Sequence, residues 1–157
     1  MGSKDKALRL TIKVLLAGAF IGILITVISF GGYHAAGSSV FCMSCHSMKE
    51  VGATWKQSQH KQFACIECHL PDSNIAVQVA YKTKAGLNDL YHETLRAYPA
   101  TIIISSEARE IADGNCLRCH SSTVQNTFMV EEEGDCLKCH HGLVHGTEKI
   151  AGGINVE

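Results

Sequence analysis

Residues 42–46 read Cys-Met-Ser-Cys-His, and the same Cys-x-x-Cys-His pattern occurs three more times in the 157-residue chain. In the attachment signal for c-type haem, two thiols form thioether bonds to the porphyrin and the adjacent histidine reaches the iron. Four copies therefore predict four covalently bound haems c and a protein that transfers electrons. The copies account for all eight cysteines, which are Cys42, Cys45, Cys65, Cys68, Cys116, Cys119, Cys136 and Cys139.

Two other uses of cysteine fit this pattern less well. A disulfide framework gives no reason for a histidine directly after every second cysteine. Two zinc knots built from Cys-x-x-Cys pairs remain an alternative, although structural zinc does not need a histidine at the next position. Haem attachment also indicates a compartment, because in bacteria it takes place on the outer side of the cytoplasmic membrane.

An uncharged and almost wholly apolar segment covers residues 14–33. Its length is near the lower limit of the roughly 17–25 residues that span a bilayer core. Four basic residues precede the segment, and no lysine or arginine follows it before Lys49. By the positive-inside rule, we expect a cytoplasmic basic tail over residues 1–13, a single-pass anchor over 14–33 in the cytoplasmic (inner) membrane, and a periplasmic tetrahaem domain over 34–157.

A cleaved signal peptide is the alternative explanation of this segment. Against it, the apolar run is longer than the usual 7–15 residues of a signal core. The small residues at 35–38 form only a loose cleavage site. Cleavage would leave a soluble tetrahaem shuttle, so retention in washed membranes separates the two hypotheses.

The part of the chain beyond the anchor is small for the four haems that it is predicted to hold. About 120 residues would house four haems, which leaves too little chain to enclose a conventional side-chain core. We expect the porphyrins to form the core. The predicted fold is mostly α-helical and irregular, with a single N-terminal transmembrane helix and a compact tetrahaem cytochrome c domain with little β structure. The formal charge is −1 and no basic stripe occurs, so nucleic-acid binding is not indicated.

Local signals place several elements between and after the motifs. Asp72 or Ser73 is the predicted N-cap of a helix that runs to about Tyr98. A short apolar run over 101–104 predicts a buried strand or a contact with the membrane surface. Ser106 caps a brief helix, for which Gly114 is the predicted stop. Little order is expected over the tail at 146–157.

The histidines outside the motifs supply candidate second ligands for the irons. His60 stands five residues before Cys65, and His145 five residues after His140, so each can turn towards a different haem. We predict these two as iron ligands, which leaves the chain two short of full six-coordination. The other three have simpler explanations at an interface, on a helix surface or directly beside a motif, and they are His34, His92 and His141.

Taken together, these features resemble the membrane-anchored quinol dehydrogenases of the NapC/NirT family. The resemblance rests on the basic tail, the single apolar segment, the four motifs, Met48 two residues after the first motif histidine, and Lys82 with Asp89 on the intervening helix. It covers nearly the whole chain. It implies oxidation of menaquinol and transfer of electrons through four haems to a periplasmic pentahaem-type nitrite reductase catalytic subunit. A general electron hub of the same family, serving nitrate or another periplasmic reductase, is the alternative.

The resemblance also implies a set of iron ligands. Spacing alone favours His46 at the first iron, with Met48 as a soft filler of the core. The resemblance instead implies Met48 as the ligand there. It further implies that His69 pairs with His145, that His120 pairs with His60, and that His140 pairs with a lysine from the catalytic subunit.

Lys82 and Asp89 are the predicted quinol-site residues. They stand seven residues apart, about two helical turns, and so share one face of the predicted helix. Quinol oxidation releases two protons with two electrons, so a proton acceptor must lie beside the electron acceptor. The resemblance implies Asp89 on the open side of the first haem and Lys82 in the lining of the quinol pocket. On the residues alone, both are ordinary solvated charges.

Overall fold

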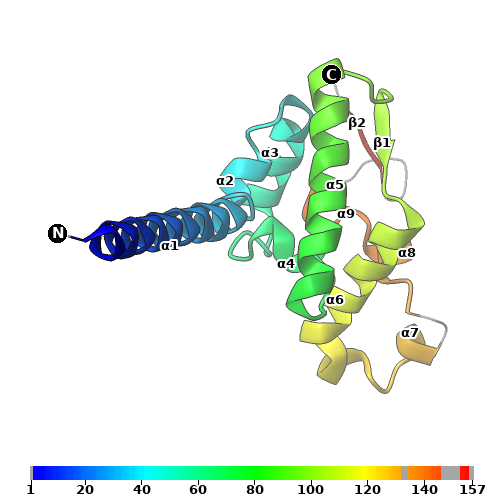
Figure 1. Cartoon of the computed structure of the whole chain (residues 1–157). Coiled ribbons are helices and arrows are strands. Elements are labelled where there is room, and N and C mark those ends of the chain that lie inside the picture. Colours follow the sequence, from blue (N-terminus) through cyan, green and yellow to red (C-terminus); the bar gives the residue numbers. More distant parts are fainter. Residues whose placement is uncertain (1, 132–133, 146–152, 156–157) are drawn as a thin grey trace. The chain divides into compact units, whose positions relative to one another are not determined.

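A computed structural model describes residues 2–131, 134–145 and 153–155 and divides the chain into two units, Met1–Ala36 and Gly37–Glu157. Helices dominate both units, and the described residues contain only two short strands (Figure 1). This confirms the predicted fold class, which is mostly helical with little β structure and one long apolar helix at the N-terminus.

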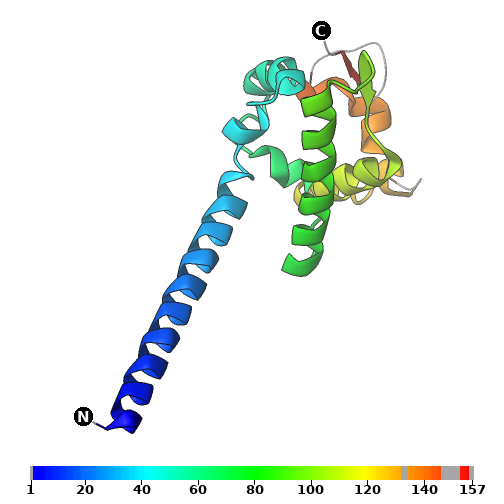
Figure 2. The same cartoon turned by 45° about the horizontal axis from the view of Figure 1, so that its top comes forward.

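The first unit is one unbroken helix, α1 (Ser3–Ala35), as Figure 2 shows. At 1.5 Å per residue its 33 residues extend about 50 Å, more than the bilayer core of about 30 Å. Its segment Lys4–Ala35 is long and apolar enough to cross a membrane. Large side chains such as Leu15, Phe20 and Phe30 are exposed on it. The helix includes most of the predicted basic tail, since it begins at Ser3. At its start, the Asp5 carboxylate accepts a hydrogen bond from the Gly2 N–H at 3.1 Å.

The second unit, called the head below, is a chain of short helices around two longer ones. Two motifs are short helices of their own, a third lies inside α6, and the first spans the end of α2 and the start of η1 (Figure 1). The elements are α2 (Ser39–Cys42), η1 (His46–Met48), α3 (Lys49–Gln57), α4 (Cys65–His69), α5 (Ile75–Leu95), β1 (Thr101–Ile103), α6 (Ser106–Val124), α7 (Phe128–Glu131), α8 (Cys136–His140), α9 (Gly142–His145) and β2 (Gly153–Asn155).

Helix α5 is shorter at both ends than the sequence predicted. Asn74 is its N-cap, and its side-chain oxygen accepts the Val77 N–H at 3.1 Å. At the other end, Arg96 adopts a left-handed conformation with φ of 52°. The Ala97 N–H then bonds to the His92 carbonyl at 3.0 Å, and the His92 ring donates to the Ala97 carbonyl at 2.6 Å. These contacts end the helix before Tyr98.

The predicted stop at Gly114 is wrong, because α6 continues through the third motif to Val124. A glycine inside a helix costs only about 1 kcal/mol relative to alanine, which contacts elsewhere along a helix can offset. The helix also begins one residue earlier than expected, since Ser105 is its N-cap and accepts the Ala108 N–H at 3.2 Å. The third motif and the segment that precedes it therefore form one continuous helix.

Within the short run at 101–104, residues Thr101–Ile103 form strand β1. A strand was predicted there, but it is not buried as expected, since Ile103 is 60% exposed. It pairs antiparallel with β2, with Thr101 opposite Asn155 and Ile103 opposite Gly153. The prediction of little order in the tail is therefore wrong for 153–155. The other residues of that tail lie outside the described part of the chain.

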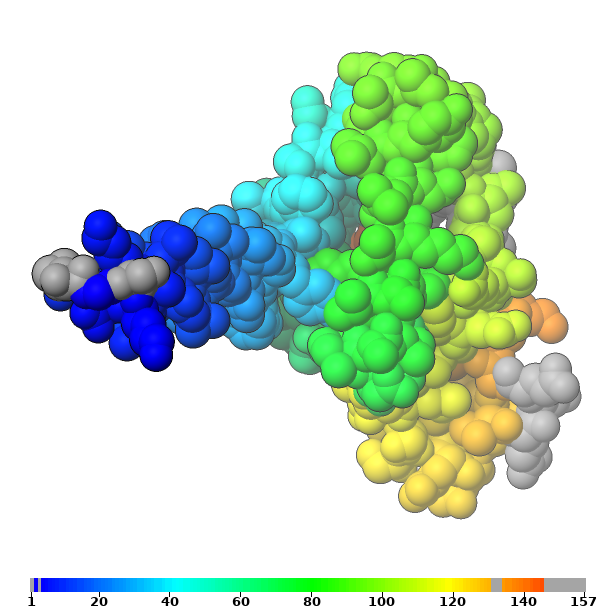
Figure 3. Space-filling model, viewed as in Figure 1, coloured from blue at the N-terminus to red at the C-terminus, as the bar shows by residue number. Residues whose placement is uncertain are grey.

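The described part of the head has almost no side-chain core. Ala112, at 8% exposure, is the one buried apolar residue among the described residues. Large apolar side chains such as Phe41, Leu87 and Leu90 stay exposed, and α5 forms part of the head's surface along its length in Figure 3. This surface agrees with a domain whose interior is built from prosthetic groups instead of side chains.

Candidate functional site

The four motifs lie next to one another in the order of the sequence. Helix α2, which ends at Cys42 of the first motif, contacts α4, the helix of the second motif. Helix α6, which contains the third motif, contacts α8, the helix of the fourth motif. Helix α4 also contacts α6, which places motif two beside motif three. None of the eight cysteines forms a disulfide.

Two histidine pairs face each other across the motifs. The ring centres of His60 and His120 are 6.2 Å apart, and those of His69 and His145 are 6.0 Å apart. His60 and His145 each have a buried ring nitrogen, Nδ1, without a hydrogen-bond partner in the described residues. Burial and the neighbouring His69 lower the pKa of His145, which favours a neutral ring able to bind a metal.

This geometry fits haem iron between the rings. Two imidazoles that bind one metal from opposite sides each need a metal–nitrogen bond of about 2 Å, which separates the ring centres by about 6 Å. In each pair, one ring belongs to a motif and is next to its second cysteine. A zinc site needs four ligands in a tetrahedron, and no group of three or more candidate ligands occurs among the described residues.

His46 and His140 differ from the paired histidines. Neither ring contacts another aromatic ring among the residues that the structure describes. Two of the three histidines that the sequence set aside have local contacts: the ring centre of His34 lies 4.4 Å from that of Phe30, and the His92 ring bonds to the Ala97 carbonyl at the end of α5. The structure therefore brings together the two predicted pairs and leaves two motif histidines without a histidine partner.

Several charged residues of α5 interact with the first motif. Desolvation lowers the pKa of Lys82, and the nearby Cys42 thiol opposes that shift. Desolvation raises the pKa of Cys45, and the carboxylates of Glu93 and Asp89 raise it further. Lys82 therefore interacts electrostatically with the first cysteine of this motif, Cys42, and Asp89 with the second, Cys45.

The Asp89 carboxyl is suited to take up a proton. Desolvation raises its pKa, although His92, Asn88 and His69 act in the opposite direction. Asp89 is also exposed, so a proton that its carboxyl takes up can pass on to solvent.

Glu93 is a site residue that sequence reasoning missed. Its Oε1 accepts the His46 backbone N–H at 2.7 Å, and its Oε2 accepts the Ser47 hydroxyl at 2.8 Å. Ser47 is 8% exposed, so this contact fixes a buried position of the turn that carries Met48. The Ser47 hydrogen bond is the main cause that lowers the pKa of Glu93. The spacing of the residues could have indicated Glu93, because it follows Asp89 by about one helical turn and so lies on the same face of α5.

Helix α3 packs against the first motif through a glycine. A Cβ atom on Gly52 would lie 2.5 Å from Cγ and Sδ of Met43, which is an x residue of that motif. Met48 is the N-cap of the same helix and is half-buried. The turn with Met48 is therefore held from two sides, by Glu93 and by the close approach of α3.

The x residues of motifs two and three also link their motifs directly. Arg118 donates from Nη2 to the Glu67 backbone carbonyl at 2.8 Å and to its carboxylate at 3.2 Å. Haem attachment leaves these two positions free, so the sequence could not assign them a role. In the fold they lock two neighbouring motifs together.

Four haem-attachment motifs packed in a helical head, with a long apolar N-terminal helix, define a membrane-anchored multihaem c-type cytochrome. The chain belongs to the NapC/NirT cytochrome c family, whose N-terminal-region model matches residues 4–150. It therefore carries c-type haem.

Similar proteins include the cytochrome c nitrite reductase subunit NrfH of Nitratidesulfovibrio vulgaris, which is 34% identical over 71% of this chain and 70% of its own length. The cytochrome c-type protein TorC of Escherichia coli is 38% identical over 53% of this chain and 23% of its own length. A chain in the crystal structure of the cytochrome c nitrite reductase NrfHA complex bound to the HQNO inhibitor matches with a TM-score of 0.74 at 31% identity, over 87% of this chain and 93% of that chain.

Proposed function

We propose that this protein oxidises menaquinol at the membrane and passes the electrons through four c-type haems to a periplasmic multihaem nitrite reductase. The observation that carries the proposal is the match to a chain of the NrfHA complex, which covers 93% of that chain. Nitrite chemistry then takes place in the catalytic partner, and this chain is the quinol dehydrogenase of the complex.

For the haem irons, the proposed ligands are those that the family resemblance implies. The ring pairs at 6.2 Å and 6.0 Å support His120 with His60 and His69 with His145. His140 lies on the short helix α8 without a histidine partner in the described residues, which supports a ligand from outside the chain, a lysine of the catalytic subunit. Bound haem supplies one-electron redox chemistry, whose potential depends on the axial ligands.

At the first motif, the proposed quinol site has two residues with different roles. Asp89 accepts a proton from the quinol, because its carboxyl is partly desolvated and interacts electrostatically with Cys45 of the first motif. Lys82 donates a hydrogen bond to a quinol oxygen and orients the ring. Met48 binds the first iron from the turn that Glu93 holds. Proton acceptor and electron acceptor then lie side by side, as a two-electron, two-proton oxidation requires.

A general electron hub for another periplasmic reductase remains the second candidate. Its specific support is the 38% identity to TorC, over 53% of this chain. Purification in mild detergent separates the two proposals. We expect a multihaem nitrite reductase subunit to come away with this chain. Co-purification of a different reductase in its place would favour the hub.

The anchor and the haem load make the first testable prediction. If residues 14–33 are retained as an anchor, the membrane-extracted protein should begin at or before Lys4. Its intact mass should contain four haem additions, one for each motif. A mature chain that begins near Ala35 would contradict the anchor and, with it, direct access to quinol.

A further inference from the structure

Asn115 holds the second motif from helix α6. It is 5% exposed, and its amide Nδ2 donates to the carbonyls of Cys68 and Leu70, both at 2.9 Å. These carbonyls flank His69 and lie at the C-terminal end of α4, where a helix leaves carbonyls without partners. Because both neighbours are acceptors, the amide nitrogen must face them, and the orientation of the side chain is fixed.

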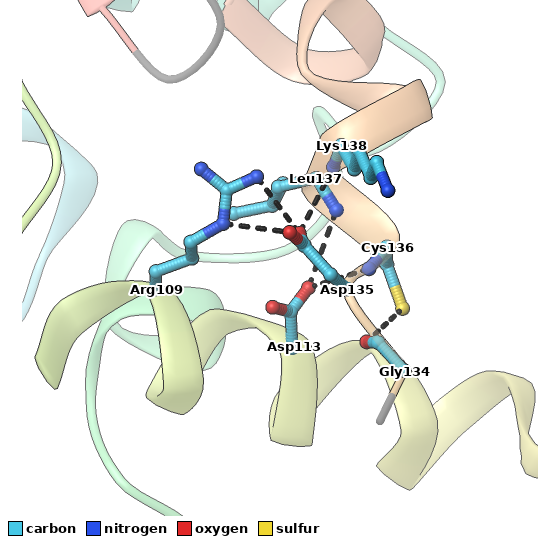
Figure 4. Close-up of polar contacts among 7 residues, drawn as sticks. All are labelled: Arg109, Asp113, Gly134, Asp135, Cys136, Leu137 and Lys138. Atoms are coloured by element: carbon cyan, nitrogen blue, oxygen red, sulfur yellow. Dashed lines mark hydrogen bonds and ion pairs between the residues drawn. The ribbon is translucent and has the colours of Figure 1, made fainter. Parts of the chain in front are cut away.

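Asp113, two residues earlier on the same helix, holds the fourth motif. Its Oδ1 accepts the backbone N–H of Cys136 at 3.0 Å and that of Leu137 at 3.3 Å. Both N–H groups lie at the start of α8, where the helix itself offers them no acceptor. The Cys136 N–H also donates to the Gly134 carbonyl at 2.9 Å. Figure 4 shows Asp135 beside it, which accepts the Lys138 N–H at 3.0 Å and is bound by Arg109 at 2.8 Å.

The two side chains are matched to opposite ends of two helices. A carboxylate meets the N–H groups of α8, and an amide donor meets the carbonyls of α4. At about 100° per residue, positions 113 and 115 lie about 200° apart around α6, so they reach in opposite directions. The next residue, Cys116, begins the third motif on the same helix.

We infer that Asp113 and Asn115 are positioning residues that fix the second and fourth haem motifs on the helix that carries the third. The spacing of three haems along the electron path is then set by one short segment of α6. Asn115 acts on the haem bound through His69, because it holds the backbone on both sides of that histidine. The inference rests on haem attachment at these motifs and does not depend on the proposed quinol site.

A reciprocal pair of isosteric changes tests the inference. Asp113→Asn keeps an oxygen that can accept both N–H groups, so the ferric low-spin signal of every haem should stay unchanged. Asn115→Asp turns a carboxylate towards two carbonyls and loses both donated bonds. We expect it to shift the potential and the low-spin signal of the His69–His145 haem and to leave the other haems unchanged. Asn115→Ser, which is small and uncharged but too short to reach both carbonyls, should shift the same haem.

The measurement is a mediator titration of the full-length protein with optical and electron paramagnetic resonance detection, which needs no quinol. Intact mass establishes that each variant carries four haems. Lys84→Ala is the matched control, since it removes an exposed 3.0 Å ion pair with Glu107 of α6 and should shift no haem. Unchanged haems in both Asn115 variants would overturn the inference, as would an equal shift of all four. A disturbance by Asp113→Asn as large as that by Asn115→Asp would overturn it too. A failure of the quinol site would change none of these readings.

Discussion

Replacing Asp89 by asparagine should slow menaquinol-driven nitrite reduction by at least about tenfold, since loss of a general base typically costs about 10²–10⁴-fold in rate. The change nearly preserves volume but removes the carboxylate that takes the quinol proton. A water molecule that replaces the base in part would account for an effect at the lower end. The rate is measured in membranes that contain the partner reductase, with menaquinol as the electron donor.

Dye-driven nitrite reduction in the same membranes is the control for this prediction. An artificial reductant delivers electrons without releasing quinol protons, so Asp89→Asn should leave that activity intact. Lys82→Leu should also spare it and should mainly weaken quinol binding, because the ammonium orients the quinol and takes up no proton. If both activities fall together in either variant, the residue supports the fold or the haem chain, and the proposed quinol site is in the wrong place.

Replacing Met48 by leucine should change the spectrum of the first haem and depress quinol oxidation. Leucine occupies a similar volume, so the packing around the turn should be kept while the thioether is lost. A thioether ligand raises the haem potential relative to two histidines, which favours acceptance of electrons from quinol. Electron paramagnetic resonance of the purified protein and the menaquinol-driven rate measure the two effects.

His46→Ala is the matched variant for this second prediction, since His46 belongs to the same turn. It should disturb the first haem much less, because its backbone N–H to Glu93 remains available after the ring is removed. The opposite pattern would assign His46 as the ligand. That pattern is an unchanged spectrum in Met48→Leu and loss of first-haem ligation in His46→Ala.

Much of this protein was predictable because its chemistry lies in contiguous stretches. Each Cys-x-x-Cys-His motif carries its attachment cysteines and its histidine within five residues, so no folding information is needed to find it. The apolar segment at 14–33 likewise predicted a long helix, and α1 contains all of it. The face shared by Lys82 and Asp89 follows from helical periodicity alone.

Predictions that depended on helix ends were less accurate. Gly114 looked like a stop, but α6 continues past it, since Asp113 and Asn115 on either side are bonded to other motifs. The N-cap of α5 is Asn74 and not Asp72 or Ser73, because the side-chain oxygen of Asn74 accepts the Val77 N–H. Long-range contacts decide which of several plausible local signals is used.

Short stretches of sequence were enough to predict the haem-attachment motifs, the apolar helix and the helical character of the head. The contacts between residues far apart in the chain depend on the tertiary fold. The fold places the ring of His60 opposite that of His120 and the ring of His69 opposite that of His145. It also brings Glu93 to Ser47, which stands 46 residues earlier in the chain. The reason is physical. Thioether chemistry and hydrophobicity act within a short window of residues, whereas these contacts depend on the directions in which several helices and turns lead the chain between them.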